Sequence, residues 1–565
     1  MKKIVISVLS VVFIAVVAAA LYFRSGTEYK RSGERVLEEK YYYNCEQIAD
    51  KSALDYLRDV KISYQYEDGI RLVDYPNGYH VDLPKDCTFD LSMSMFTVVA
   101  ENENYKIDIS KERSPYEDVD GYIAHYNNRF ITSPEYQKAN QIECLEDTTR
   151  KIGGQDIRLI SLHRTPYPGS EIEKNYYTYA YLKNPNEQQG YYRLLIRCRE
   201  YDIKEIEQIL ESFTIIKPKG KATYQFTSEP VLPDWNEETA QFYQDFCNRD
   251  EVMWGAYTHK LLDDDGMRED IRTLEEKVEF TFPLVMGYTY LSPNPPVKAM
   301  QEAYEQGKAV ELTLQISTVD NAGLDSSKNP NFEVLDGQKD DVIRQFAQKI
   351  RDFGHPILFR LNNEMNTDWT SYSGMVTLCD PDIYKAIHER VFRIFKEEGV
   401  QNVIWIFNPQ YGDYPPNLWN NYLRYYPGND QIQVLGITGY NTGNYYEEVS
   451  AEVWRSFKDI YDECETLYTE NFGNLPWMIT EFSCSSYGGN KPNWIRNMFA
   501  DIKQYKNIKA AVWFSFGDWD FREGRESIVA RPYFMDETEE TVQAFRDGFD
   551  GKVPSSRLPE EEPGE

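Results

Sequence analysis

Between about residues 250 and 550 the chain alternates short apolar runs with amphipathic helical stretches, and this alternation constrains the fold most. Stretches 340–353 and 383–398 carry apolar residues at helical spacing. Such an alternation predicts a parallel sheet whose strands are joined by helices. Eight units in about 300 residues match the size of a closed (β/α)8 TIM barrel. The predicted strands are Val252–Tyr257, Phe282–Tyr288, Ala309–Ile316, Pro356–Leu361, Val403–Phe407, Val434–Tyr440, Trp477–Glu481 and Ala510–Phe516.

An open doubly wound sheet would show the same alternation of strands and helices. The nucleotide-binding motifs G-x-G-x-x-G and Walker A, which accompany many such sheets, do not occur in this sequence. The G-x-S-x-G motif of nucleophile-elbow hydrolases does not occur either. The sequence therefore favours the barrel.

Composition shifts divide the chain into a barrel, a smaller α+β domain before it, and connecting segments. Residues 41–217 hold alternating apolar and polar runs typical of antiparallel strands, followed by an amphipathic helix over 202–213. These late strands and the helix resemble the PsbP/Mog1-like fold, and we expect a spacer or binding role. The predicted segments are 1–24 (transmembrane segment), 25–40 (linker), 41–217 (α+β accessory domain), 218–248 (linker), 249–550 (barrel) and 551–565 (disordered tail).

The N-terminus indicates export. Lys2 and Lys3 precede Ile4–Phe23, a run of 20 residues without a charge, and Arg24 closes it. Such a run forms a helix of about 30 Å, the thickness of a bilayer core. We expect a single-pass anchor in the cell membrane with the remaining chain outside. Cleavage as a signal peptide is the alternative, and it would leave a secreted protein.

Charge and composition exclude several classes of partner and cofactor. A net charge of −31 argues against nucleic acid as a ligand. The six histidines are not paired at metal-ligand spacing, so we expect neither a metal nor a cofactor. Export permits disulfides among the eight cysteines, and Cys45–Cys87 with Cys144–Cys198 is one of three possible pairings in the N-terminal half.

Two predicted barrel strands end in a glutamate followed by loop-like sequence. Glu364 follows the fourth strand within 359–369, and Glu481 ends the seventh within 476–482. Working residues of such barrels lie at the C-terminal ends of the strands. Two carboxyls on opposite sides of one cleft are what hydrolysis of a glycosidic bond requires.

An ordered series of motifs from about 250 to 550 resembles glycoside hydrolase family 26. The series comprises 340–369, 405–409, 426–428, 436–441 and 476–482. The resemblance implies a retaining clan A barrel that cuts β-mannans, or in some members mixed-linkage β-glucans or β-1,3-xylans.

The resemblance also implies roles for individual residues. Glu364 matches the acid/base of the family, and Glu481 matches its nucleophile. Trp369 matches an aromatic that stacks on the sugar, and Tyr440 matches a tyrosine that hydrogen-bonds the nucleophile. Trp513 resembles the aromatic floor beneath the sugar.

Arg360 matches an arginine of the fourth strand, which would hold the nucleophile ionised. His259, near the end of the first strand, would contact substrate or serve the structure. Asn408 is placed in the cleft without a role.

Two positions depart from the family pattern. Asn363 stands where the family usually has histidine, and in other clan A families an asparagine there binds the sugar 2-hydroxyl. Thr438 stands where an aspartate is common. Both departures point to altered substrate preference.

We therefore expect a membrane-anchored, extracytoplasmic endo-β-glycanase that acts on a β-linked polysaccharide with retention. A non-catalytic glycan-binding barrel in polysaccharide capture or export is the alternative, and an enzyme that trims a polymer of its own cell is a third hypothesis. The backbone sugar, endo or exo action and the oligomeric state stay open.

Overall fold

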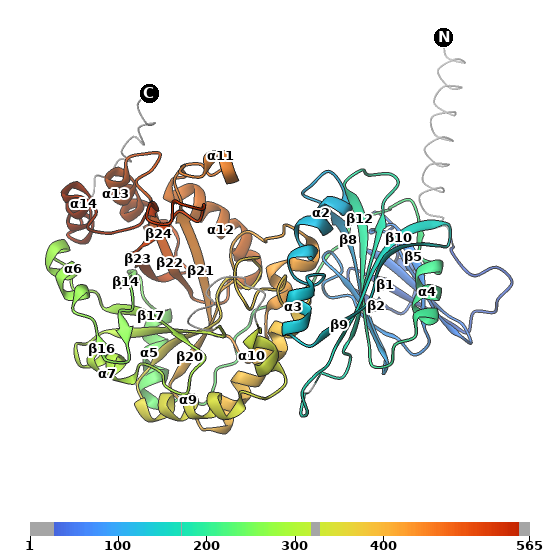
Figure 1. Ribbon diagram of the computed structural model, residues 1–565, viewed down its shortest axis with the longest axis horizontal. Coiled ribbons are helices and arrows are strands. Elements are labelled where there is room, and N and C mark those ends of the chain that lie inside the picture. Colours follow the sequence, from blue (N-terminus) through green and yellow to red (C-terminus); the bar gives the residue numbers. More distant parts are fainter. Residues whose placement is uncertain (1–27, 171, 318–327, 553–565) are drawn as a thin grey trace, which may run out of the picture. The chain divides into compact units, whose positions relative to one another are not determined.

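The computed structural model describes residues 28–170, 172–317 and 328–552. These residues form two compact units, shown in Figure 1. Within the described residues, the first comprises the chain up to Pro166, Ser170–Phe226 and Pro416–Asn421, and the second comprises Tyr167–Gly169, Thr227–Pro415 and the chain from Tyr422 onward.

The first unit contains two antiparallel sheets. The six-stranded sheet has the order β13-β5-β4-β3-β1-β2, and the seven-stranded sheet has the order β6-β7-β8-β12-β11-β10-β9. The strands of the first sheet are β1 (Glu38–Tyr43), β2 (Glu46–Ile48), β3 (Val60–Gln65), β4 (Gly69–Asp74), β5 (Tyr79–Pro84) and β13 (Thr214–Ile215). Those of the second are β6 (Thr88–Asp90), β7 (Val98–Glu101), β8 (Tyr105–Arg113), β9 (Ile142–Ile152), β10 (Gln155–Arg164), β11 (Tyr176–Lys183) and β12 (Gly190–Cys198).

One apolar core joins both sheets and the last helix of this unit. Leu72 of the first sheet, Leu194 of the second and Ile206 of α4 (Ile203–Ser212) belong to the same buried cluster. Two short helices, α2 (Val119–His125) and α3 (Pro134–Ala139), connect β8 to β9. The predicted α+β architecture and the helix over 202–213 are thus present in the structure.

Eight parallel strands close the barrel of the second unit, and this confirms the predicted fold class of the catalytic domain. Seven of the eight strands begin and end within two residues of their predicted bounds, and the seventh strand in chain order extends three residues beyond its predicted end, Glu481. The strands are β14 (Met253–Tyr257), β17 (Leu284–Tyr290), β18 (Ala309–Gln315), β19 (Ile357–Leu361), β20 (Val403–Phe407), β21 (Val434–Asn441), β22 (Trp477–Cys484) and β23 (Ile508–Phe514).

Amphipathic helices surround the barrel because their apolar stripes need a partner surface. In α9, Ile343, Phe346 and Ile350 are buried, and the helix ends at Gly354, whose φ of 76° is left-handed. The helices are α5 (Glu237–Cys247), α6 (Asp270–Val278), α7 (Val297–Glu305), α8 (Pro330–Leu335), α9 (Asp340–Phe353), α10 (Pro381–Glu397), α11 (Glu447–Ser450), α12 (Phe457–Phe472), α13 (Lys491–Asp501) and α14 (Glu539–Phe549).

The crossover from β20 to β21 departs from the regular pattern. Its residues, all described, form only the short 3-10 turns η3 (Leu418–Asn420) and η4 (Tyr422–Tyr425) instead of an α-helix. Two small hairpins add to the strand ends: β15 (Leu262–Asp263) with β16 (Gly266–Met267), and β24 (Gly517–Trp519) with β25 (Val529–Pro532).

The predicted linker 218–248 is wrong in its second half. Helix α5 lies there, capped by Asn236, and its Tyr243 and Phe246 belong to the apolar cluster of the barrel. Pro230 and Pro233 indicate a loop before this helix, whereas its two buried aromatics per 11 residues give only a weak periodic signal.

The structure also bears on the possible disulfides, the predicted membrane segment and the predicted tail. All eight cysteines are free, so none of the three pairings considered for the first four cysteines, Cys45–Cys87 with Cys144–Cys198 among them, is present in the structure. The predicted membrane segment 1–24 lies outside the described residues, as does nearly all of the tail 551–565. Within the described ranges, none of the helices combines the length and the apolar character needed to cross a membrane.

Candidate active site

Glu364 lies in a tight turn directly after β19. Asn362 and Glu364 both have left-handed backbones, with φ of 53° and 55°. The backbone N–H of Glu364 donates to the carbonyl of Asn408 at 2.9 Å, and the N–H of Asn362 donates to the carbonyl of Leu314 at 2.9 Å. Non-glycine residues in this region carry strain that the surrounding structure must hold. The turn therefore fixes the direction of the Glu364 side chain.

Glu481 lies inside β22, where the strand pairing with β21 shifts register between Ile437 and Thr438. Its side chain is nearly buried, at 6% exposure. Arg360 Nη1 lies 2.7 Å from Glu481 Oε1, and the Tyr440 hydroxyl donates to Glu481 Oε2 at 3.0 Å. This carboxylate thus receives one positive charge and one O–H donor.

Glu364 has a different environment. Burial, and after it the negative charge of Glu481, raise its pKa to about 7. The indole N–H of Trp369 donates to Glu364 Oε2 at 3.0 Å and opposes this rise. Glu364 can therefore carry a proton near neutral pH, whereas Glu481 faces the guanidinium of Arg360. Two carboxyls with environments this different can divide the roles of acid and nucleophile.

Arg360 is fully buried and is held from two sides. Its Nε donates to Thr313 Oγ1 at 2.8 Å, and its Nη1 donates to Asn408 Oδ1 at 2.5 Å. Asn408 therefore orients the guanidinium, a contact that the sequence alone did not indicate. Tyr288 of β17 presents its ring to the same guanidinium, 5.5 Å from the ring centroid.

Asn363 is also fixed by its neighbours. Its Oδ1 accepts hydrogen bonds from Gln315 Nε2 at 3.0 Å and from the Tyr372 hydroxyl at 2.8 Å. Sequence reasoning missed both partners. Gln315 occupies an end position of a barrel strand, which is the one available signal, whereas Tyr372 comes from the long loop after β19.

Two exposed aromatics stand beside Glu364. Trp369 is 38% exposed and Tyr414 is 43% exposed, and their ring centroids lie 5.2 Å apart. Exposed aromatic faces next to a carboxyl pair suit the apolar faces of sugar rings.

Trp513 does not line the site. It is 1% exposed and packs against Phe482, Trp494 and Phe545, which places its ring between the strands and the helices. The next residue, Phe514, contacts Tyr440 instead. The expectation that the Trp513 ring lies beneath the sugar does not fit this packing, because side chains of a strand alternate between its two faces and Phe514 is the one that lies beside Tyr440.

His259 lies at the exposed end of the first strand. Its ring stacks on Phe516 with a centroid distance of 4.6 Å. The ring of Trp519, which is 40% exposed, also packs against Phe516, with a centroid distance of 5.0 Å. The structure gives His259 a stacking partner and does not connect it to Glu364 or Glu481. In the described residues no cluster of side chains that could hold a metal ion occurs.

A closed (β/α)8 barrel with one carboxyl after the fourth strand and another on the seventh has the architecture of the glycoside hydrolase barrels. Residues 305–507, which include both glutamates, match the model of glycosyl hydrolase family 26. The match to family 26 therefore covers the central part of the barrel, from before its third strand to after its seventh.

Two curated proteins are similar to parts of the chain. Endoglucanase H of Acetivibrio thermocellus is 30% identical over 208 residues, which are 35% of this chain and 22% of that protein. Mannan endo-1,4-beta-mannosidase of Thermothelomyces thermophilus is 27% identical over 124 residues, 22% of each protein. The chain thus matches 22% of the length of each relative.

Solved structures with a similar fold include two family 26 enzymes. The catalytic domain of the Bacillus sp. JAMB-750 GH26 endo-beta-1,4-mannanase is 17% identical, with 57% of this chain and 92% of that chain covered and a TM-score of 0.42. The GH26 beta-mannanase BoMan26A of Bacteroides ovatus is 14% identical, with 55% and 93% covered and a TM-score of 0.41.

Proposed function

We propose that the protein is a retaining endo-β-glycanase, with Glu364 as acid/base and Glu481 as nucleophile. The observation that carries the proposal is the contrast between the two carboxyls. Arg360 and Tyr440 contact Glu481, while burial and the charge of Glu481 raise the pKa of Glu364 to about 7. This contrast supplies a proton donor and an anionic nucleophile in one site.

The proposed reaction is a double displacement. A carboxylate oxygen of Glu481 attacks the anomeric carbon, the glycosidic C–O bond breaks, and the proton of Glu364 passes to the departing oxygen. Glu364, now a carboxylate, takes a proton from water while the water oxygen attacks the same carbon. The bond to Glu481 breaks, and both carboxyls return to their first state.

The surrounding residues have positioning roles in this scheme. Arg360 and Tyr440 hold Glu481 in one orientation, so that its attacking oxygen is pre-organised. Trp369 holds Glu364 and offers an exposed ring to the sugar. Asn363, fixed by Gln315 and Tyr372, is positioned to bind a sugar hydroxyl.

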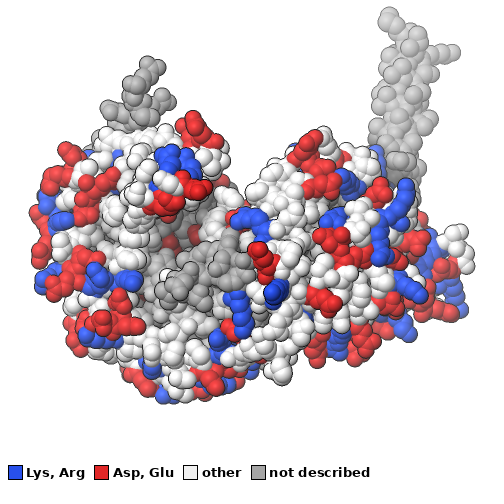
Figure 2. Space-filling view, in the orientation of Figure 1, with Lys and Arg blue, Asp and Glu red and all other residues white. Residues whose placement is uncertain are grey.

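The proposed substrate is a neutral β-linked polysaccharide. The similar curated proteins carry the names of an endoglucanase and of a mannan endo-1,4-beta-mannosidase. Asn363 and Thr438 replace residues typical of the mannan-cutting pattern, so mixed-linkage β-glucan belongs in the panel beside β-mannan. On the face shown in Figure 2, acidic and basic side chains are interspersed, an arrangement that suits an uncharged polymer.

We further propose that residues 4–23 anchor the protein in the cell membrane with the barrel outside. Their charge-free run of 20 residues between Lys3 and Arg24 supports this proposal. Fractionation of producing cells tests it: an anchored protein stays with membranes and is digested by protease added outside the cell.

A reducing-end assay of the full chain tests the activity. The panel is β-mannan, mixed-linkage β-glucan, cellulose, β-1,3-xylan and β-1,4-xylan, with Glu481→Ala assayed beside the wild type. We expect release on one of these polymers and none by the variant. Binding of a polymer without new reducing ends, by a folded protein, would support the glycan-binding barrel instead.

A further inference from the structure

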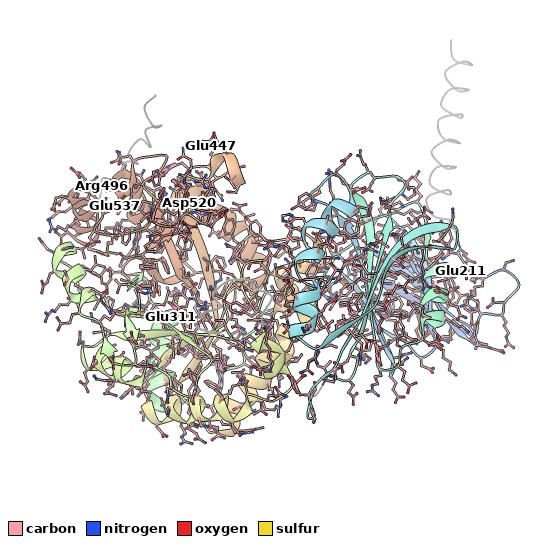
Figure 3. All side chains as sticks on the ribbon, viewed as in Figure 1. Glu211, Glu311, Glu447, Arg496, Asp520 and Glu537 are labelled. Atoms are coloured by element: carbon pink, nitrogen blue, oxygen red, sulfur yellow. The ribbon has the colours of Figure 1, made fainter. Side chains whose placement is uncertain are left out.

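Glu311 is a carboxyl in an otherwise apolar layer of the barrel interior. It is the third residue of β18, and its partners in the neighbouring strands are Met286 and Leu358, both in the apolar cluster of the barrel. Its exposure is 0%. Figure 3 labels it among the strands of the barrel unit. An acid at such a position costs folding free energy, and apolar packing of the barrel gives no reason for it.

Glu311 lies next to Arg360, a residue of the candidate active site. Its Oε1 lies 3.4 Å from Nε of Arg360, the residue that pairs with Glu481. Thr313, two residues further on the same strand, accepts the hydrogen bond of that Nε. Among the described residues, neither oxygen of Glu311 has a hydrogen-bond partner, and neither does Nη2 of Arg360.

One guanidinium thus faces two carboxyls. Glu481 is the closer, at 2.7 Å, and Glu311 is at 3.4 Å. In a site this buried, the positive charge of Arg360 compensates one carboxylate, and a second carboxylate would have no compensating charge. The pKa of Glu311 is raised to about 8, chiefly by burial; Arg360 opposes this rise and the charge of Glu481 adds to it. Charge balance therefore favours an un-ionised Glu311 at neutral pH.

We propose that Glu311 is a positioning residue, which supports Arg360 from the layer below as an un-ionised carboxylic acid and so leaves the whole charge of Arg360 to Glu481. The inference rests on the proposed glycosidase function. An ionised Glu311 would compete with Glu481 for the guanidinium. An apolar side chain would remove the carboxyl from that side and leave Thr313 as the polar contact of Nε from β18. Tyr288 of β17 also faces Arg360, and Glu364 and Tyr372 interact electrostatically with the same guanidinium.

Kinetics of two substitutions test the role. Glu311→Leu should lower kcat by about 30-fold or more with little change in KM, and should move the acidic limb of the pH profile of kcat/KM to higher pH. Glu311→Gln, an isostere of the un-ionised acid, should recover activity to within about fivefold of wild type. Met286→Leu changes the same layer conservatively and should leave the profile in place.

Two outcomes would overturn the inference. If Glu311→Leu lowers only the melting temperature and leaves the acidic limb unmoved, the residue is structural. If Glu311→Gln loses as much activity as Glu311→Leu, Glu311 acts as a carboxylate.

Infrared spectroscopy of the full chain separates this inference from the activity. In a Glu364→Gln background, which removes the other raised carboxyl of the site, the spectrum is compared with and without Glu311→Gln. We expect a difference band of a protonated carboxylic acid at pH 6.5, which disappears as the pH rises through about 8. Absence of the band in a folded protein would overturn the inference, whether or not any polymer is cleaved. If the band is present but every polymer stays intact, the proposed function fails and the un-ionised state of Glu311 stands.

Discussion

Arg360 and Glu481 form a buried ion pair, with Nη1 and Oε1 2.7 Å apart, and the rest of the site is arranged around it. Asn408 and Thr313 hold the guanidinium, and Tyr440 holds the far oxygen of the carboxylate. Removing one partner of such a pair leaves an uncompensated buried charge. The pair therefore links the stability of the barrel to the orientation of the proposed nucleophile.

The pKa of Glu364 determines the pH at which kcat/KM falls on the alkaline side of the pH profile. Its pKa, raised to about 7 by burial and by Glu481, means that the proton required for leaving-group departure is lost as the pH rises through 7. We expect kcat/KM to fall tenfold per pH unit well above that value. A profile of wild type on the cleaved polymer, between pH 4 and 9, measures it. A plateau that extends to pH 9 would contradict the assigned acid.

Trp369 affects the alkaline side of the pH profile, because its indole N–H lowers the pKa of Glu364. Trp369→Phe keeps an aromatic ring but removes the donor at 3.0 Å from Glu364 Oε2, and this donor favours the carboxylate. The alkaline limb should therefore move to higher pH by up to about one unit. Trp519→Phe, the same change at another exposed tryptophan, should leave the limb in place. A shift to lower pH in Trp369→Phe would contradict the contact.

Tyr440 orients Glu481 through a hydrogen bond of 3.0 Å. Tyr440→Phe should lower kcat about 10- to 100-fold, equivalent to about 1.4–2.7 kcal/mol, with KM little changed. Tyr243→Phe is the matched control, because its hydroxyl donates to the carbonyl of Gln433 beside the apolar cluster of the barrel. Steady-state kinetics of both variants decide the matter, and an equal loss in both would refute a specific role for Tyr440.

Glu311 makes the stability of the protein depend on pH. Its folded-state pKa of about 8 lies above the ordinary value of 4.5, so the folded state binds more protons between these values. Stability from this group is complete below about pH 4.5 and is lost as the pH rises through 8. Thermal unfolding should show Glu311→Gln gaining stability relative to wild type from pH 5 to pH 9. A constant difference would mean that Glu311 does not titrate in this range.

The barrel could be predicted because its strands are buried on both faces and appear as continuous apolar runs. The same property hid the orientation of Trp513: a strand that is apolar throughout does not show which side chains face inward. Helix α5 was missed because proline-rich sequence precedes it and only a few of its residues are buried. The hairpin β15–β16 was not predicted either, because its strands of two residues each are too short to show an alternating pattern.

Glu364 and Glu481 were singled out because each follows an apolar run of a predicted strand, although Glu481 lies inside β22 and not at its end. In the structure Arg360 and Tyr440 both contact Glu481. The partners that hold the site, such as Asn408 and Tyr372, come from other strands and loops. Their contacts depend on the closed barrel and on a long loop, and no local pattern reports them.

The stereochemistry of the first product tests the central claim most directly. Proton NMR of the reaction on the polymer that the wild type cleaves should show the β-anomer of the new reducing end first, followed by mutarotation to the α-anomer, because two displacements retain configuration. Appearance of the α-anomer first would show a single displacement by water, and would contradict Glu481 as the nucleophile.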